Sequence, residues 1–227
     1  MSSNRYRWYL VGASLSFPDF VRLVQDDLYL DDKDSGFDFW DLKRRSFTAR
    51  YIAKRMVGVE RVDPFGRVSV LEDVVFSYVE FEISLVRKGL YLLKVVNPPA
   101  SLKKFMWAIG SICGDRSYVD PVRFSLDDLY EDYRRDSGFS RVSVRSLRVK
   151  NVSVSPDALG RVDLISQRDA YKELRSWLAG RKYTIDRLNI IGYEDGNEVA
   201  VQISSSGLIR CDSVHSEFFT SYISRLQ

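Results

Sequence analysis

The segment Val75–Cys113 limits the possible folds more than any other, because a strand pattern and a helix pattern follow each other with clear boundaries. Val75–Ile83 has strand composition, a polar break ends at Gly89, and Leu90–Val96 is an apolar run. This order predicts a β-hairpin. In Ala100–Cys113 apolar residues recur at i, i+3, i+4 and i+7, which predicts a helix with one buried face.

The same order of elements returns near the C-terminus. Val199–Ser204, a turn at Gly207 and Leu208–Cys211 predict a second hairpin, and a helix pattern follows it. We therefore predict an α+β fold of two pseudo-repeated β-α-β-β-β-α units, with mostly antiparallel sheets and helices packed on one side. The expected segments are 1–113 for the first half, 114–160 for an inserted helix and irregular strand, and 161–227 for the second half, which together can form one compact domain.

Capping residues predict where the helices begin. Ser16, Ser125 and Ser166 are each followed by an aspartate at the third position, an arrangement typical of helix N-termini. We expect Asn97 to cap the helix that ends at Cys113, because its side chain can accept a hydrogen bond from a free N–H group.

The predicted strands differ in how regularly their apolar residues alternate. Phe47–Val62 is expected to form one strand and Val68–Val70 a separate short one, whereas Phe37–Asp41 is expected to be a loop. In Ser140–Val154 the apolar residues change parity twice, although side chains on a regular strand alternate strictly. This irregularity predicts β-bulges or two strands at an angle.

The composition excludes several classes of protein. Hydrophobic residues make up 45% of 227 residues, enough for a packed core, and the net charge of +3 is too small to indicate a polyanion partner by itself. Cys113 and Cys211 lie in apolar elements without metal-binding or disulfide spacing, so we expect buried thiols in a reducing compartment. The sequence has neither a signal-peptide pattern nor a membrane-helix run, so we expect a cytoplasmic protein without a membrane partner.

Catalytic signatures are weak. His215 is the only histidine, and no nucleophile or glycine-rich phosphate loop accompanies it, so we expect no cofactor and favour binding over catalysis. An alternative is a Mg²⁺-dependent nuclease that uses Glu80, Glu82 or the aspartates near Asp38. Glu82 lacks the lysine that such nucleases carry two positions later, because Ser84 stands there.

Basic residues give the preferred functional prediction. They form a group in the first half and a group on the irregular strand. Alternation with aromatic residues on a sheet face would let these cations follow a phosphate backbone. We predict a non-catalytic protein that binds DNA or RNA through Lys43, Arg44, Arg45, Arg50, Lys54, Arg55, Arg141, Arg145, Arg148 and Lys150.

Aromatic residues support a competing function. Phe37, Phe39 and Trp40 lie together in the segment expected to be a loop, beside several aspartates. Exposed aromatic side chains are frequent energetic centres of protein interfaces. The alternative prediction is therefore a subunit of a larger assembly, with a protein partner or self-association through these three residues.

Overall fold

The computed structural model describes residues 3–62, 64–155 and 157–227, and its described elements combine helices with antiparallel strands, so the predicted α+β class is confirmed. The chain forms two compact units. We call Tyr9–Asp120 the continuous unit, and Met1–Trp8 together with Pro121–Gln227 the split unit. Strand β1 (Asn4–Gly12) contains one of the boundaries, so it contributes residues to both units.

The continuous unit is built on long antiparallel strands. They follow the order β2 (Ser35–Leu42), β3 (Ser46–Val62), β4 (Val68–Arg87) and β5 (Leu90–Val96), with β1 next to β5. The predicted loop around Phe37 is wrong, because these residues pair with β3 as strand β2. The predicted break after Val70 is also wrong, since β4 runs through 20 residues without interruption.

Helices α1 (Phe17–Asp26) and α2 (Lys103–Cys113) cover one face of this sheet. The Ser16 side chain caps α1 as predicted, by accepting a hydrogen bond from the Asp19 amide. The cap expected from Asn97 is wrong, because α2 begins after Leu102. Phe105 of α2 packs against Phe81 at a ring distance of 5.0 Å, which joins the helix to the sheet core.

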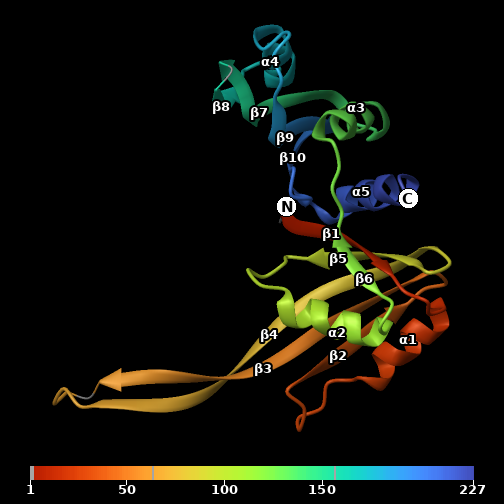
Figure 1. Cartoon of the computed structure of the whole chain (residues 1–227), viewed down its shortest axis with the longest axis vertical. Coiled ribbons are helices and arrows are strands. Elements are labelled where there is room, and N and C mark those ends of the chain that lie inside the picture. The colour runs from red at the N-terminus through yellow and green to blue at the C-terminus, as the bar shows by residue number, and fades with distance from the viewer. Residues whose placement is uncertain (1–2, 63, 156) are drawn as a thin grey trace. The chain divides into compact units, whose positions relative to one another are not determined.

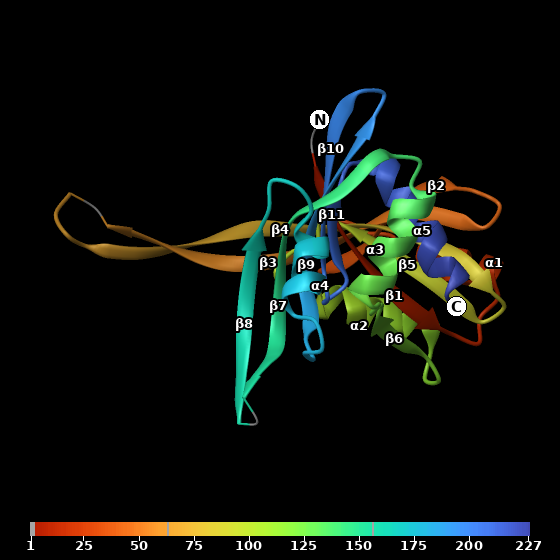
Figure 2. The ribbon, with the colours of Figure 1, turned by 90° about the horizontal axis from the view of Figure 1, so that it is seen from above.

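In the split unit, the strands are also antiparallel. Their order is β1, β11 (Leu208–Cys211), β10 (Asn197–Ser204), β9 (Thr184–Glu194), β7 (Ser140–Ser155) and β8 (Ala158–Ile165). Strand β6 (Tyr118–Pro121), which contains the second unit boundary, also pairs with β1. The predicted irregularity of β7 is confirmed, because its pairing register shifts several times against both neighbours. Figure 2 shows β7 and β8 as an extended hairpin.

Helices α3 (Leu126–Asp136), α4 (Ala170–Trp177) and α5 (Ser213–Arg225) bury apolar side chains in the split unit. Phe219 of α5 stacks on Tyr133 of α3 and contacts Trp8 of β1. The Trp8 indole also donates a hydrogen bond to Thr220 at 3.2 Å. These contacts place α5 against the face of β1 that carries Trp8.

Two of the predicted caps lie in the split unit, and they have different outcomes. The Ser125 side chain caps α3 as predicted, by accepting a hydrogen bond from the Asp128 amide. Helix α4 is capped by Asp169 rather than Ser166, because the Asp169 carboxylate accepts from the first amides of the helix. The Ser166 hydroxyl instead donates a hydrogen bond to the Glu173 side chain at 2.7 Å. Ser166 thus contacts the first turn of α4 without capping its amides.

A two-stranded arm extends from the continuous unit. The register of β3 and β4 continues from Lys54 opposite Phe76 to Val62 opposite Val68, beyond the last residues that β2 and β5 pair with. Figure 1 shows this arm running away from the rest of its unit. No helix in the described part of the chain has the length and apolar character needed to cross a membrane.

Candidate nucleic-acid interface

One face of the split unit's sheet carries the basic residues, and we call it the open face. Strand alternation separates it from the core: Tyr6 and Trp8 of β1 are buried, whereas Arg5, next to Tyr6, is exposed. On β11, Ile209 is fully buried and Arg210 is exposed. The open face is therefore the polar side of strands whose other side forms the core.

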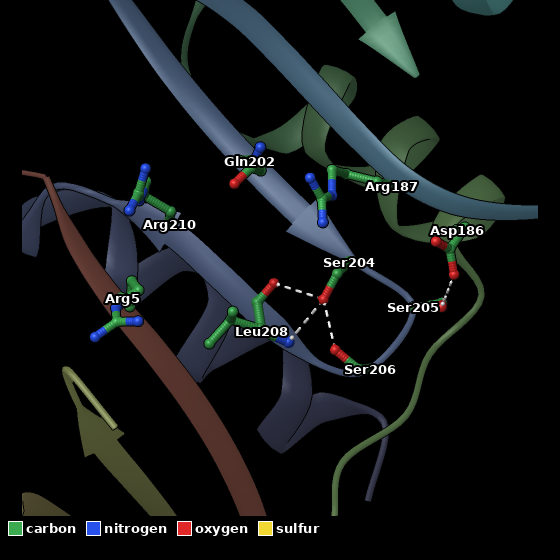
Figure 3. A pocket seen from close by; sticks show the side chains of 9 residues that line it. All are labelled: Arg5, Asp186, Arg187, Gln202, Ser204, Ser205, Ser206, Leu208 and Arg210. Carbon is green, nitrogen blue, oxygen red and sulfur yellow. Dashed lines mark hydrogen bonds between the residues drawn. The ribbon is translucent and has the colours of Figure 1, made fainter. Parts of the chain in front are cut away.

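The open face contains a cavity of about 360 Å³. Strands β1, β9, β10 and β11 and the turn between the last two supply its lining (Figure 3). The lining residues are Arg5, Asp186, Arg187, Gln202, Ser204, Ser205, Ser206, Leu208 and Arg210. No described residue in this lining is aromatic, so the cavity offers cations and hydroxyl groups rather than stacking surfaces.

Cross-strand register places arginines directly opposite each other on this face. Arg5 of β1 stands opposite Arg210 of β11. Arg187 of β9 stands opposite Arg148 of β7. Like charges in directly opposed positions destabilise a sheet. A bound anion would relieve this repulsion, so the arrangement is one expected of an anion-binding surface.

Two of these arginines lack acidic partners. The side chains of Arg187 and Arg210 form no salt bridge or hydrogen bond with any residue in 3–62, 64–155 or 157–227. Arg148, by contrast, donates from its Nε to Asp163 at 2.6 Å. Arg187 and Arg210 therefore bring to the cavity two guanidinium groups that the rest of the described protein leaves available.

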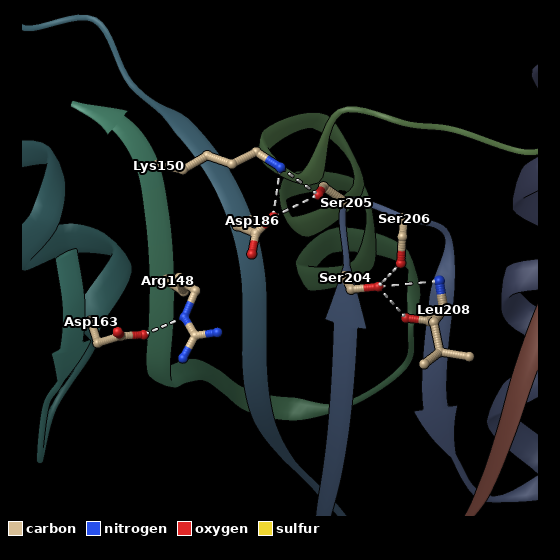
Figure 4. Close-up of polar contacts among 8 residues, drawn as sticks. All are labelled: Arg148, Lys150, Asp163, Asp186, Ser204, Ser205, Ser206 and Leu208. Atoms are coloured by element: carbon tan, nitrogen blue, oxygen red, sulfur yellow. Dashed lines mark hydrogen bonds and ion pairs between the residues drawn. The ribbon is translucent and has the colours of Figure 1, made fainter. Parts of the chain in front are cut away.

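The described carboxylate in the cavity lining is already neutralised. Asp186 accepts a hydrogen bond from Lys150 at 2.7 Å and another from the Ser205 hydroxyl at 3.0 Å (Figure 4). The hydrogen bond from Lys150 lowers the pKa of Asp186 below its usual range. Asp186 thus stays ionised but cancels Lys150 rather than an arginine of the cavity.

Neutral side chains complete the surface. Gln202 donates to Asn189 at 2.8 Å, and Asn189 donates to Ser146 at 2.5 Å, which forms a chain of hydrogen bonds across β10, β9 and β7. At the turn, the Ser204 and Ser206 hydroxyl groups lie 2.7 Å apart. Phosphate oxygens accept hydrogen bonds from hydroxyl groups and from guanidinium groups.

The predicted basic residues fall into separate units. Arg141, Arg145, Arg148 and Lys150 lie on β7 of the split unit, whereas the group from Lys43 to Arg55 belongs to the continuous unit. On β7, Arg148 is on the open face and Lys150 pairs with Asp186. Arg141 and Arg145 are exposed.

Several basic residues of the continuous unit are occupied by neighbouring groups. Arg50 lies 2.8 Å from Asp38 and over the rings of Trp40 and Tyr78. Lys43 lies 4.0 Å from Asp41.

The remaining basic residues of this group differ in their surroundings. Arg45 donates to the carbonyl groups of Leu85 and Val86, which ties it to the end of β4. Arg44 is exposed, and Lys54 and Arg55 stand at the base of the arm.

The three aromatic residues on β2 have different environments. Phe37 is buried, and Phe39 packs on Phe47 with ring centres 5.4 Å apart. Trp40 is exposed and donates to Asp38. Only Trp40 among these three therefore presents a large part of its ring to solvent.

Ser205 and Lys150 lie close together beside the cavity. Ser205 lies 3.4 Å from Lys150, an arrangement that a hydrolase could use if the lysine were neutral. The Lys150 ammonium group also forms an ion pair with the Asp186 carboxylate at 2.7 Å.

Other titratable residues are also paired. His215 is buried beside Asp212, and Glu82 is paired with Lys94 at 2.5 Å. Within the described ranges there is no group of three His, Cys, Asp or Glu side chains that could hold a metal ion.

Four residues of the open face, Arg5, Arg7, Arg187 and Arg210, were absent from the sequence-based prediction. Each is a basic residue at a polar position of an otherwise apolar strand, a signal that is present in the sequence. Their proximity depends on pairing between residues near 5, 187 and 210, which no local pattern encodes. A scan against protein-family models finds no match to this chain, and a search for relatives among curated proteins finds none either.

Proposed function

We propose that the protein binds nucleic acid without catalysis, through contacts between backbone phosphates and the open face of the split unit. The observation that carries this proposal is the cavity lined by Arg5, Arg187 and Arg210, two of which have no acidic partner among the described residues. Phosphate oxygens satisfy opposed guanidinium groups, and Arg–phosphate contacts are among the stronger hydrogen bonds in proteins.

The side chains on this face support sequence-independent recognition. The described cavity lining holds no aromatic ring for base stacking, and contacts to phosphate groups carry no sequence information directly. Affinity should therefore come mainly from counterion release and depend steeply on salt. DNA and RNA are both accommodated by this chemistry.

A salt titration with matched variants tests the proposal. Binding of generic single-stranded and duplex DNA and of RNA is measured by fluorescence anisotropy between about 50 and 200 mM salt. We expect a linear fall of log affinity with log salt, and a slope that decreases by about 1 for Arg187→Gln and again for Arg210→Gln. Arg225→Gln, an exposed arginine of α5, is the control and should retain the wild-type slope.

Two results would contradict the proposed nucleic-acid binding. Absence of binding at about 50 mM salt would reject the proposal for all three nucleic acids. Binding that Arg187→Gln and Arg210→Gln leave unchanged would reject this face as the site.

Internal duplication also remains part of the proposal. The order β8, α4, β9, β10, β11, α5 matches the predicted β-α-β-β-β-α unit, and β1, α1, β2, β3, β4, β5, α2 differs from it by one additional strand. We infer that the open face of the split unit and the corresponding face of the continuous unit have since acquired different chemistry. Structures of distantly related chains in which both halves show the same order of strand pairing would support an origin by duplication.

A further inference from the structure

The arm of the continuous unit exposes apolar side chains along its whole length. Nine residue pairs, from Lys54–Phe76 to Val62–Val68, form it. Phe65 at its tip is 86% exposed. The large apolar residues in its strands are 38% to 66% exposed and are Met56, Val59, Val62, Val68, Val70, Leu71, Val74, Val75 and Phe76. Surfaces of this kind mark interaction sites in soluble proteins.

The pairing register sorts these residues onto two faces. Directly opposed residues share a face, so Met56 and Val74 lie together, as do Glu60 and Val70. We call this side the outer face; Arg55, Leu71 and Val75 lie on the other side, the inner face. The outer face is the more apolar and consists of Lys54, Met56, Gly58, Glu60, Val62, Val68, Val70, Glu72, Val74 and Phe76.

The outer face continues onto the sheet from which the arm extends. Tyr78 follows Phe76 on the same side of β4 and is 51% exposed. Trp40 and Tyr78 flank the Arg50 guanidinium group, each ring about 5 Å from it. Aromatic residues stacked on an arginine are frequent anchors of protein interfaces. The arm and this aromatic group thus form one extended surface.

Charge favours a protein over a nucleic acid on this surface. Between residues 54 and 76 the sequence has four basic and four acidic residues, so the arm has no net charge. A phosphate backbone would meet Glu60 and Glu72 in the middle of the outer face. A neutral apolar surface instead suits burial against another protein, without repulsion between identical copies.

The distribution of charge is self-complementary. On the outer face, Lys54 is at the base of the arm, and Glu60 and Glu72 lie further towards the tip. Two arms packed in antiparallel orientation around a two-fold axis bring the lysine of each copy near the acidic residues of the other. The ten residues of the outer face, together with Arg50, Trp40 and Tyr78, give one copy the contact surface of a small protein interface.

We propose that the chain forms a two-fold dimer in which the outer faces of two arms pack against each other in antiparallel orientation. The second copy covers apolar side chains that an isolated hairpin leaves in water. It also supports a two-stranded element that is marginally stable alone. This dimer does not depend on the open face or on nucleic acid.

Measurement of mass as a function of concentration tests the dimer. Sedimentation equilibrium between about 1 and 200 μM should show a monomer–dimer equilibrium, since a small apolar interface is expected to give a dissociation constant in the micromolar range. Val74→Lys places equal charges within the two-fold interface and should raise the dissociation constant at least about 100-fold. Leu71→Lys, on the inner face of the same arm, is the matched control and should leave it within about threefold.

A charge exchange tests the antiparallel packing. Lys54→Glu and Glu60→Lys should each weaken the dimer, and the double variant should restore it because the opposite charges meet again. Hydrogen exchange of the unmodified protein supplies a result that does not depend on folding of any variant. Amides of 54–62 and 68–76 should be protected at high concentration and should exchange faster on dilution.

Specific outcomes overturn the proposal. A wild-type protein that stays monomeric at about 200 μM has no such dimer, whatever other protein or nucleic acid it binds. A dimer that resists Val74→Lys, or whose arm amides show no dependence on concentration, associates through a different surface.

Discussion

The open face of the split unit and the outer face of the continuous unit are both sheet surfaces with arginine and lysine, yet their chemistry differs. Arg187 and Arg210 have no acidic partner in the described chain, whereas Arg50 is paired with Asp38 and held between two rings. The first surface therefore carries available positive charge, and the second carries apolar and aromatic area. Counting basic residues does not separate these surfaces, because their function depends on what each cation contacts.

The largest expected effect comes from removing an aromatic core residue in one unit. Phe219→Ala and Phe81→Ala each delete a fully buried ring and should reduce the free energy of unfolding by about 3–5 kcal/mol. Phe219 supports the open face through Trp8, so its variant should also weaken nucleic-acid binding. Thermal unfolding and fluorescence anisotropy on the same samples measure stability and nucleic-acid binding. If Phe81→Ala weakened binding as much as Phe219→Ala, the two units would not differ in function.

Single arginine substitutions should have effects of opposite sign on the two faces. Arg210→Gln relieves the repulsion with Arg5 and should stabilise the fold by about 0.2–1 kcal/mol while it weakens binding. Arg50→Gln removes an ion pair and ring contacts and should destabilise by a similar amount without changing binding. Urea unfolding measures the stability of each variant, and fluorescence anisotropy measures its affinity for nucleic acid. If both variants changed stability in the same direction and both weakened binding, the two faces would not differ in the way we expect.

The smallest effect concerns Asp186. Its pKa is depressed in the folded protein, so its pairing stabilises the fold above the unfolded pKa of about 3.9 and is lost as the pH falls through the folded value. Because the pair is partly exposed, we expect this contribution to be below about 1 kcal/mol. Asp186→Asn should therefore flatten the decline of stability as the pH falls below about 3.9.

Binding supplies an independent readout for Asp186. Asp186→Asn removes a carboxylate from the cavity and releases Lys150, so affinity for nucleic acid should rise severalfold at neutral pH. The isosteric Asp163→Asn releases Arg148 on the same face and should act in the same direction. Decreased affinity in both variants would mean that these ion pairs position Lys150 and Arg148 for binding rather than mask their positive charge.

Most helices and strands could be predicted from the sequence, whereas the pairing between strands could be predicted less well. The caps at Ser16 and Ser125 and the periodicity of the helix ending at Cys113 are local signals, and the structure contains these helices. The aspartates and the glycine before Phe37 are typical of a turn, and they favour a loop at this position. Phe37 lies in a strand, since pairing with β3 and burial of its ring outweigh local preference.

The candidate sites depended still more on tertiary structure. Arg148 could be selected from the sequence because basic residues are dense in β7, but isolated arginines such as Arg187 and Arg210 could not. The arm was also missed, because Val68–Phe76 has the composition of a core strand and nothing local shows that it lacks a covering layer. Exposure of an apolar strand is decided by which elements reach it.

The sequence by itself determined the α+β class, the positions of most strands and helices, and the irregularity of Ser140–Val154. These properties follow from periodicity, capping and turn residues, which act over a few neighbouring positions. Only the tertiary structure decided that Arg5 faces Arg210, that Lys150 rather than an arginine neutralises Asp186, and that the arm is exposed. Cross-strand register and the absence or presence of a covering element join residues far apart in the chain, and local patterns carry no record of them.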